Sequence, residues 1–152
     1  MRISDDILGR MPPTELLETV APIPIWWAAM AQALRSPNRR HRTGAVIFED
    51  GKVLAKGTAY PVEDLKVRSV HAERDAIAYW QDKNHGECLI VTLTRVGNFA
   101  QVSRPCIGCA DALDQRGIEW VVFAEKANDG SWVVRREPPC DLLNGKPTRY
   151  RR

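Results

Sequence analysis

The chain has 152 residues, of which 44% are hydrophobic and 27% charged, an ordinary balance for a single globular domain. Its formal net charge of +3 permits an anionic substrate but gives no argument of its own for a nucleic-acid partner. No apolar run approaches the roughly 18 residues of a membrane-spanning helix, and the first residues lack the layout of a secretory signal. We therefore expect one cytoplasmic domain over residues 1–152, without a membrane partner, with residues 1–24 as a lead-in and 137–152 as a basic tail.

The first predicted elements are two helices. Four prolines between residues 12 and 24 confine any first helix to residues 14–20. From Ile25 to Leu34, apolar residues recur at three- and four-residue spacing, which predicts an amphipathic helix. This helix should end before Ser36-Pro37, because proline disfavours a helical conformation in the residue ahead of it.

A predicted hairpin follows. Two short apolar runs, Ala45–Phe48 and Val53–Ala55, flank Asp50-Gly51, a dipeptide typical of tight turns between strands. Residues 57–70 are polar and predict a loop. Another helix is predicted over Ala72–Trp80.

Strands and helices alternate in the second half of the chain. Cys88–Leu93 is rich in β-branched residues and predicts a strand, and a helix follows from Cys106 to about Arg116. Ile118–Ala124 and Trp132–Val134 predict the fourth and fifth strands. Because the turn at Asn128–Gly130 is too short for a crossover, these two strands should be antiparallel. The order predicts an α/β fold with three layers, α/β/α, around a mixed five-stranded sheet.

Two short motifs begin the two middle helices: His71-Ala72-Glu73 and Pro105-Cys106-Ile107-Gly108-Cys109. Cys106 and Cys109 should project from the same side of one helical turn, where the helix N-terminus favours thiolates. One histidine and two cysteines are one ligand short of the tetrahedral shell of zinc, and a catalytic zinc holds water in that open place. Glu73 is well placed to move protons to and from that water.

Other uses of these cysteines must be weighed. Four cysteines could form two disulfides, but nothing indicates export and two of them form a C-x-x-C, which favours metal binding. A lone C-x-x-C also occurs in redox pairs and in closed structural zinc sites. A closed site would need a fourth ligand, for which Cys88 and His85 are poorly placed candidates. A non-catalytic structural zinc protein is the main alternative to an enzyme.

H-x-E followed by P-C-x-x-C is typical of the zinc-dependent nucleobase deaminases, and the chain resembles this superfamily of cytidine and deoxycytidylate deaminases. The resemblance implies the cytidine deaminase-like fold and one Zn²⁺ per chain, with a bound water, held by His71, Cys106 and Cys109. It implies that Glu73 is the catalytic proton shuttle and that the backbone N–H of Ala72 binds the substrate carbonyl. The implied reaction is hydrolytic deamination of a cytosine-type base in a nucleoside or nucleotide, such as cytidine or dCMP, with release of ammonia.

The resemblance has informative departures. The run Ser36–Phe48 is similar to the stretch that precedes the histidine in deoxycytidylate deaminases. Those enzymes follow a glycine, here Gly57, with an aromatic residue and an asparagine that contacts the sugar, whereas this chain has Thr58-Ala59. They commonly carry Glu before Pro-Cys, where this chain has Arg104. An antiparallel fifth strand is similar to cytidine deaminases and to several toxin-type deaminases that act on polynucleotides, so the substrate stays open.

Two basic groups bear on the substrate. Arg39, Arg40 and Arg42 precede the first strand and are candidate contacts for a phosphate, although a solvated loop explains them equally well. The basic residues of the tail, Lys146 to Arg152, could follow a nucleic-acid backbone, although basic chain ends are commonly just solvated. Single-stranded DNA or RNA, or another heterocyclic amidine, is therefore the alternative substrate. The resemblance also implies a homo-oligomer, because family members commonly complete their pockets with a loop of a neighbour.

Overall fold

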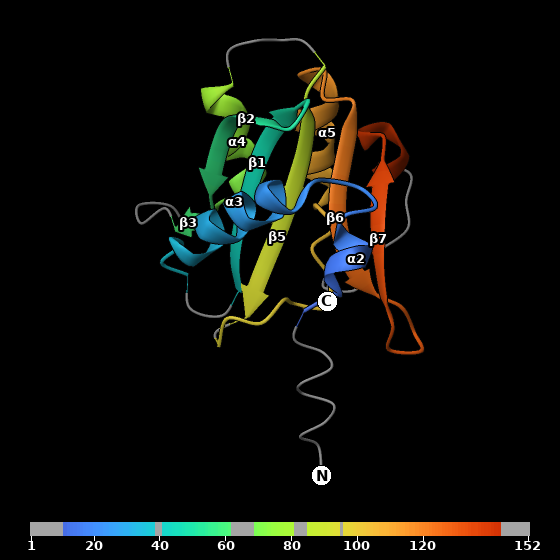
Figure 1. The fold of residues 1–152 in the computed structure, drawn as a ribbon. Coiled ribbons are helices and arrows are strands. Elements are labelled where there is room, and N and C mark those ends of the chain that lie inside the picture. The colour runs from blue at the N-terminus through green and yellow to red at the C-terminus, as the bar shows by residue number, and fades with distance from the viewer. Residues whose placement is uncertain (1–10, 39–40, 62–68, 81–84, 95, 144–152) are drawn as a thin grey trace.

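The computed structural model describes residues 11–38, 41–61, 69–80, 85–94 and 96–143. Within these ranges, five strands form a mixed sheet in the order β2-β1-β5-β6-β7 (Figure 1). Neighbouring strands are antiparallel except β5 and β6, which run parallel. The strands are β1 (His41–Glu49), β2 (Lys52–Thr58), β5 (Glu87–Thr94), β6 (Trp120–Lys126) and β7 (Trp132–Glu137).

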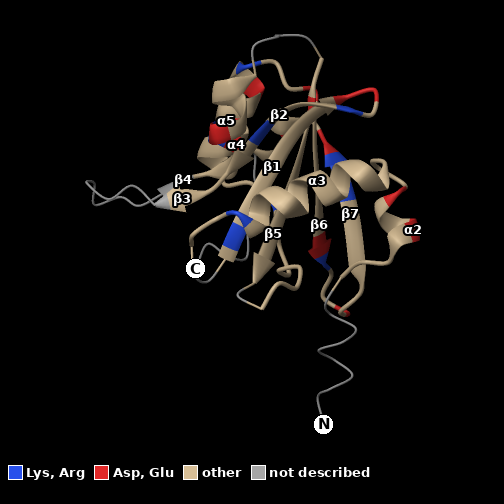
Figure 2. Ribbon diagram, turned by 60° about the vertical axis from the view of Figure 1, so that its left-hand side comes forward, with Lys and Arg blue, Asp and Glu red and all other residues tan. Residues whose placement is uncertain are grey.

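Helices cover both faces of this sheet. α2 (Thr14–Leu17) and α3 (Ile23–Leu34) lie on one face, and α4 (Ala72–Tyr79) and α5 (Ile107–Gln115) lie on the other. Figure 2 shows α3 on the opposite side of the sheet from α4 and α5, with acidic and basic residues interspersed along the described ribbon. The predicted three-layer fold is confirmed. No helix in the described ranges combines the length and the apolar character needed to cross a membrane.

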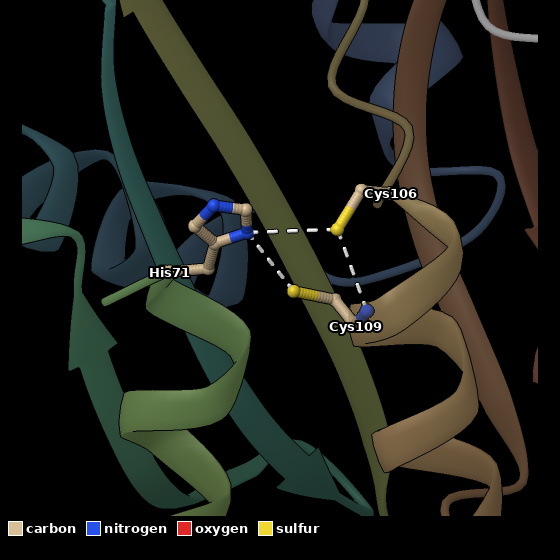
Figure 3. A group of neighbouring side chains, drawn as sticks. All are labelled: His71, Cys106 and Cys109. Atoms are coloured by element: carbon tan, nitrogen blue, oxygen red, sulfur yellow. Dashed lines mark hydrogen bonds between the residues drawn. The ribbon is translucent and has the colours of Figure 1, made fainter. Parts of the chain in front are cut away.

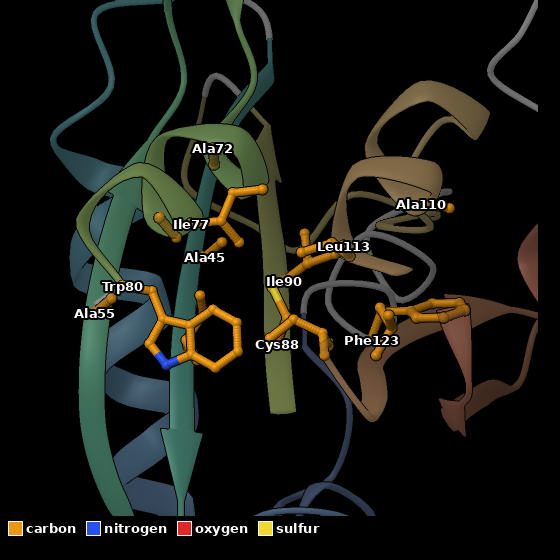
Figure 4. Packing of buried hydrophobic residues seen from close by; sticks show 14 of the residues in the cluster. Ala45, Ala55, Ala72, Ile77, Trp80, Cys88, Ile90, Ala110, Leu113 and Phe123 are labelled. Carbon is orange, nitrogen blue, oxygen red and sulfur yellow. The ribbon is translucent and has the colours of Figure 1, made fainter. Parts of the chain in front are cut away.

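Alternation along the strands divides the core into two clusters. Ala45 and Ile47 of β1 face α4 and α5, whereas Val46 and Phe48 face α3, because successive strand residues point to opposite faces. Figure 4 shows the first cluster, in which Trp80 and Leu113 pack with strand residues beneath the two motif helices. Both helices that carry the motifs thus rest on one continuous apolar layer.

The predicted hairpin and the antiparallel fifth strand are confirmed. β1 pairs with β2 through a turn at Asp50-Gly51, both at positive φ, and β6 pairs with β7 from Val121↔Glu137 to Lys126↔Trp132. The first helix is shorter than predicted and ends at Leu17. α3 begins two residues earlier than predicted, at Ile23, because a proline in the first helical turn loses no hydrogen bond.

Two regions depart further from the prediction. Residues 57–70 are not simply a loop, since Tyr60–Pro61 (β3) and Ser69–Val70 (β4) pair as a short antiparallel ribbon. The segment after residue 137 is not only a tail. Its 3₁₀ helix η1 (Pro139–Leu142) packs against α5 and buries Leu142 in the core. Local polarity reveals neither the pairing of Tyr60 with Val70 nor the docking of η1 onto α5.

Candidate metal centre

Three potential metal ligands meet where α4 and α5 begin. Nδ1 of His71 lies 3.1 Å from Sγ of Cys109 and 3.6 Å from Sγ of Cys106 (Figure 3). The ligand atoms of all three residues lie within 4.8 Å of one another. The structure therefore brings together the three residues that the two motifs predicted.

The start of each helix places these side chains. His71 and Cys106 are the N-cap residues of α4 and α5, both with extended backbone, so each side chain stands at a helix N-terminus. The backbone N–H of Cys109 donates to Sγ of Cys106 over 3.4 Å. Hydrogen bonds from the Cys109 side chain and from His71 lower the pKa of the Cys106 thiol to about 3. The bond to Cys106, together with burial, raises the pKa of the Cys109 thiol.

The spacing of these atoms fits zinc. Tetrahedral zinc with ordinary bond lengths separates a nitrogen and a sulfur ligand by about 3.6 Å and two sulfurs by about 3.8 Å. The distance from His71 to Cys106 matches this value at 3.6 Å, and that to Cys109 needs only a small expansion from 3.1 Å. A soft donor set of one imidazole and two thiols is one that zinc prefers.

The two candidates for a fourth ligand lie elsewhere. Cys88 is fully buried in the apolar cluster of β5, and His85 is exposed and pairs with Glu119 at 3.3 Å. Among the described residues, the ligand group consists of His71, Cys106 and Cys109. This arrangement favours an open site over a closed structural one.

Two contacts fix the position of α4. A Cβ at Gly57 on β2 would fall against the carbonyl oxygen of Ala72 and the backbone nitrogen of Ala76, so the strand and the helix touch through their backbones. The backbone N–H of Thr58 also donates to the carboxylate of Asp75 over 3.0 Å. β2 thereby fixes the position, relative to the sheet, of the first turn of α4, which follows His71.

Glu73 is the second residue of α4, and it is only 4% exposed. Burial raises the pKa of its carboxyl above the ordinary value, while the charge of His71 opposes the shift. Glu73 also lines the same cavity as His71 and Cys106. A buried carboxyl group therefore shares a cavity with two of the three potential metal ligands.

This cavity has a volume of about 570 Å³. One wall comes from the paired ends of β1 and β5, where His41 faces Thr94 and Thr43 faces Thr92. The hydroxyls of Thr43 and Thr92 lie 3.0 Å apart, and Ser103 accepts a hydrogen bond from the Thr92 backbone. A cavity of this size, polar on one side and lined by His71 and Cys106, suits a small organic ligand.

Comparison with known proteins agrees with this geometry. The family described as "Cytidine and deoxycytidylate deaminase zinc-binding region" matches residues 26–125, about two thirds of the chain. The chain belongs to this family. The predicted resemblance and the zinc cofactor are thereby confirmed. A search of the curated proteins finds no match.

Solved structures of deaminases share the fold. Cytidine deaminase from Burkholderia pseudomallei is 22% identical, with a TM-score of 0.57 over 80% of this chain and 95% of that one. A mutant of cytidine deaminase from Mycobacterium tuberculosis is 16% identical, with a TM-score of 0.55 over 83% and 97%. Cytidine deaminase from Mycobacterium leprae is 18% identical, with a TM-score of 0.54 over 81% and 97%. At these identities the likeness establishes the fold.

Of the predicted substrate contacts in this chain of the deaminase family, one lines the cavity, one lies on β1 and two lie outside the described residues. Ala72 is fully buried and lines the cavity. Arg42 lies on β1 and donates to the carbonyl of Thr94 over 3.2 Å, and its role as a phosphate contact stays a prediction. Arg39 and Arg40 lie outside the described residues, as does the basic tail from residue 144.

The missing asparagine changes one edge of the cavity. Ala59 lines it with a small apolar side chain, while the Thr58 hydroxyl is bound to Gln32 of α3, 2.8 Å from its side-chain oxygen. The polar residues of the β1–β5 wall were not singled out from the sequence. Their alternation along an otherwise apolar strand, at Thr92 and Thr94, was the available signal.

Replacing a ligand should remove the metal. We expect wild-type protein to carry one zinc ion per chain and Cys106→Ser to bind zinc at least about 10-fold more weakly, because serine supplies no thiolate. Cys140→Ser is the matched control, since Cys140 is exposed on η1 and outside the ligand group. Metal analysis after dialysis measures the difference. Equal zinc in both variants would refute the site.

Proposed function

We propose that the protein is a zinc-dependent hydrolytic deaminase of an amino-pyrimidine. It would convert a cytosine-type base of a nucleoside or nucleotide to the uracil type and release ammonia. The observation that carries this proposal is the placement of buried Glu73 in the same cavity as the ligands His71 and Cys106. A purely structural zinc site has no use for a buried acid beside an open coordination place.

The chemistry that zinc supplies in such a site is the activation of water at neutral pH. His71, Cys106 and Cys109 would hold it. Glu73 would accept a proton from the attacking water and deliver it to the ring nitrogen. It would next transfer the second water proton to the departing amino group, so that the carbon–nitrogen bond breaks and ammonia leaves as the carbonyl forms.

The first residue of α4 would orient the base. Ala72 follows the N-cap, and the backbone N–H groups at the start of a helix have no partner within the helix. Ala72 lines the cavity, so its N–H is a suitable donor to the carbonyl oxygen of the ring. The positive end of the helix dipole strengthens this bond.

A substrate panel tests the proposal. Zinc-loaded protein should release ammonia from cytidine or dCMP, with weak dependence on salt, while Cys106→Ser should not. If only single-stranded oligonucleotides were deaminated, and binding fell steeply as salt rose, the substrate would be a nucleic acid and not a free nucleoside or nucleotide. No ammonia from any nucleoside, nucleotide or oligonucleotide would contradict pyrimidine deamination and leave another heterocyclic amidine. Assembly as a homo-oligomer stays a prediction, which light scattering would test.

A further inference from the structure

An arginine occupies the cavity wall two residues before a metal ligand. Arg104 lines the cavity that holds Glu73 and Cys106, and its side chain keeps only 14% of its surface exposed. Withdrawing a charged group such as a guanidinium from water is costly unless it is paired, so its position needs partners that hold it. These partners determine which nitrogens of the Arg104 guanidinium are left to bind a ligand.

Glu125 of β6 is the first of these partners. Nη2 of Arg104 lies 3.1 and 3.3 Å from its two carboxylate oxygens. The guanidinium also stands over the ring of Phe123, 5.2 Å from its centroid. These contacts fix the side chain in one orientation, and both bonds to Glu125 use a single nitrogen of the guanidinium.

The same carboxylate is shared with a second cation. Nε of Arg135 on β7 lies 2.8 Å from Oε2 of Glu125, and the Arg135 side chain is 42% exposed. Arg135 is not among the described residues that line the cavity. Glu125 thus pairs with both guanidinium groups, and Arg135 also lies 4.0 Å from Glu137. The two bonds of Arg104 to Glu125 use Nη2 alone, so Glu125 does not take up the other guanidinium nitrogens.

We propose that Arg104 binds an anionic phosphate group of the substrate and so determines a preference for nucleotides over nucleosides at this site. The inference rests on the proposed function, because it concerns the substrate of the same cavity. Arginine suits the task, since its planar fork presents several donors and remains charged. The cavity of about 570 Å³ has room for more than a base.

Two arginine variants separate this role from a structural one. Arg104→Gln and Arg135→Gln each remove one partner of Glu125, but only the first removes a charge from the cavity wall. For Arg104→Gln we expect kcat/KM to fall about 10- to 100-fold for a cytosine nucleoside 5′-monophosphate, as for loss of a charged hydrogen bond. The value for the matching nucleoside should change less than about 3-fold. Arg135→Gln should leave the ratio of the two substrates unchanged.

A binding measurement keeps the inference independent of turnover. Calorimetry with inorganic phosphate should detect binding to wild-type protein and to Arg135→Gln, and little or none to Arg104→Gln. If wild-type protein deaminated no substrate but bound phosphate, and Arg104→Gln lost that binding, the proposed function would be wrong and this inference would stand. Deamination with an unchanged substrate ratio in Arg104→Gln, or no phosphate binding by wild-type protein, would overturn it.

A conservative variant covers the case in which Arg104→Gln does not fold. Arg104→Lys keeps the charge and a partner for Glu125 but loses the forked geometry. We expect it to retain the fold and to show a preference for the monophosphate that lies between wild type and Arg104→Gln. A preference equal to wild type would show that charge alone suffices. A complete loss of preference, with the nucleoside still deaminated at the wild-type rate, would contradict the role of charge.

Discussion

Glu73→Gln should abolish deamination while leaving the fold and the zinc content in place. Glutamine has nearly the same shape as glutamate but cannot accept a proton, and general acid–base catalysis contributes typically about 10²- to 10⁴-fold. The side chain is 4% exposed, so the amide would fill the same buried space in the first turn of α4. Rates of ammonia release, metal analysis and thermal melting measure the three quantities.

A matched control distinguishes loss of the shuttle from loss of a charge. Glu87→Gln removes a carboxylate of β5 that pairs with Arg136 at 3.1 Å and does not line the cavity. Its deamination rate should equal that of the wild type. If Glu73→Gln retained more than about a tenth of the wild-type rate, the acid–base role would be wrong. If wild-type protein bound zinc but deaminated nothing, the structural-zinc alternative would stand.

Gly57→Ala should destabilise the fold by about 3 kcal/mol or more, the upper end for an overpacked site. The added Cβ would meet backbone atoms of Ala72 and Ala76 rather than a flexible side chain. The helix would have to move away from β2, and the histidine and glutamate that it carries would move with it. The melting temperature should fall by roughly 10 °C for a chain of this size. Zinc should also bind more weakly.

Gly108→Ala is the control for this prediction. Its Cβ would meet only Nη2 of Arg74, at 3.4 Å, from a helical and exposed position on α5. Alanine is favoured over glycine in a helix by up to about 1 kcal/mol, so the melting temperature should stay the same or rise slightly. Equal melting of Gly57→Ala and wild type would show that the strand and helix can separate at no cost.

Zinc should itself contribute to stability. A ligand at about 1,000 times its Kd adds about 4 kcal/mol, because it binds the folded state alone. A chelator should therefore lower the melting temperature of wild-type protein by roughly 10 °C. Cys106→Ser should show little of this response, which thermal melting with and without chelator measures. An equal chelator response in Cys106→Ser and Cys140→Ser would contradict a site built on Cys106.

Local patterns predicted most of the elements because each depends on neighbours in sequence. The Asp50-Gly51 turn specifies its hairpin, and the short turn at Asn128–Gly130 excludes a crossover, whatever the rest of the chain does. The ribbon of β3 and β4 was missed because strands of two residues are too short to show an alternating pattern. The docking of η1 was missed because its partner, α5, is distant in sequence. Polarity alone described those segments as loop and tail.

The sequence by itself determined the metal chemistry of this protein. Cys106 and Cys109 are a turn apart on one helix, and Glu73 follows His71 at a distance that no tertiary arrangement can alter. These short-range relations predict zinc ligands and a nearby acid, and the family match agrees with them.

Only the tertiary structure decided what surrounds the centre. The pairing of β1 with β5 placed Thr43 against Thr92, and the ion pair with Glu125 placed Arg104 in the cavity wall. Sheet order and register bring these residues together across 49 and 21 positions of sequence. Such long-range contacts form because strands bury their apolar faces against the helices, and no local pattern states which side chains will meet.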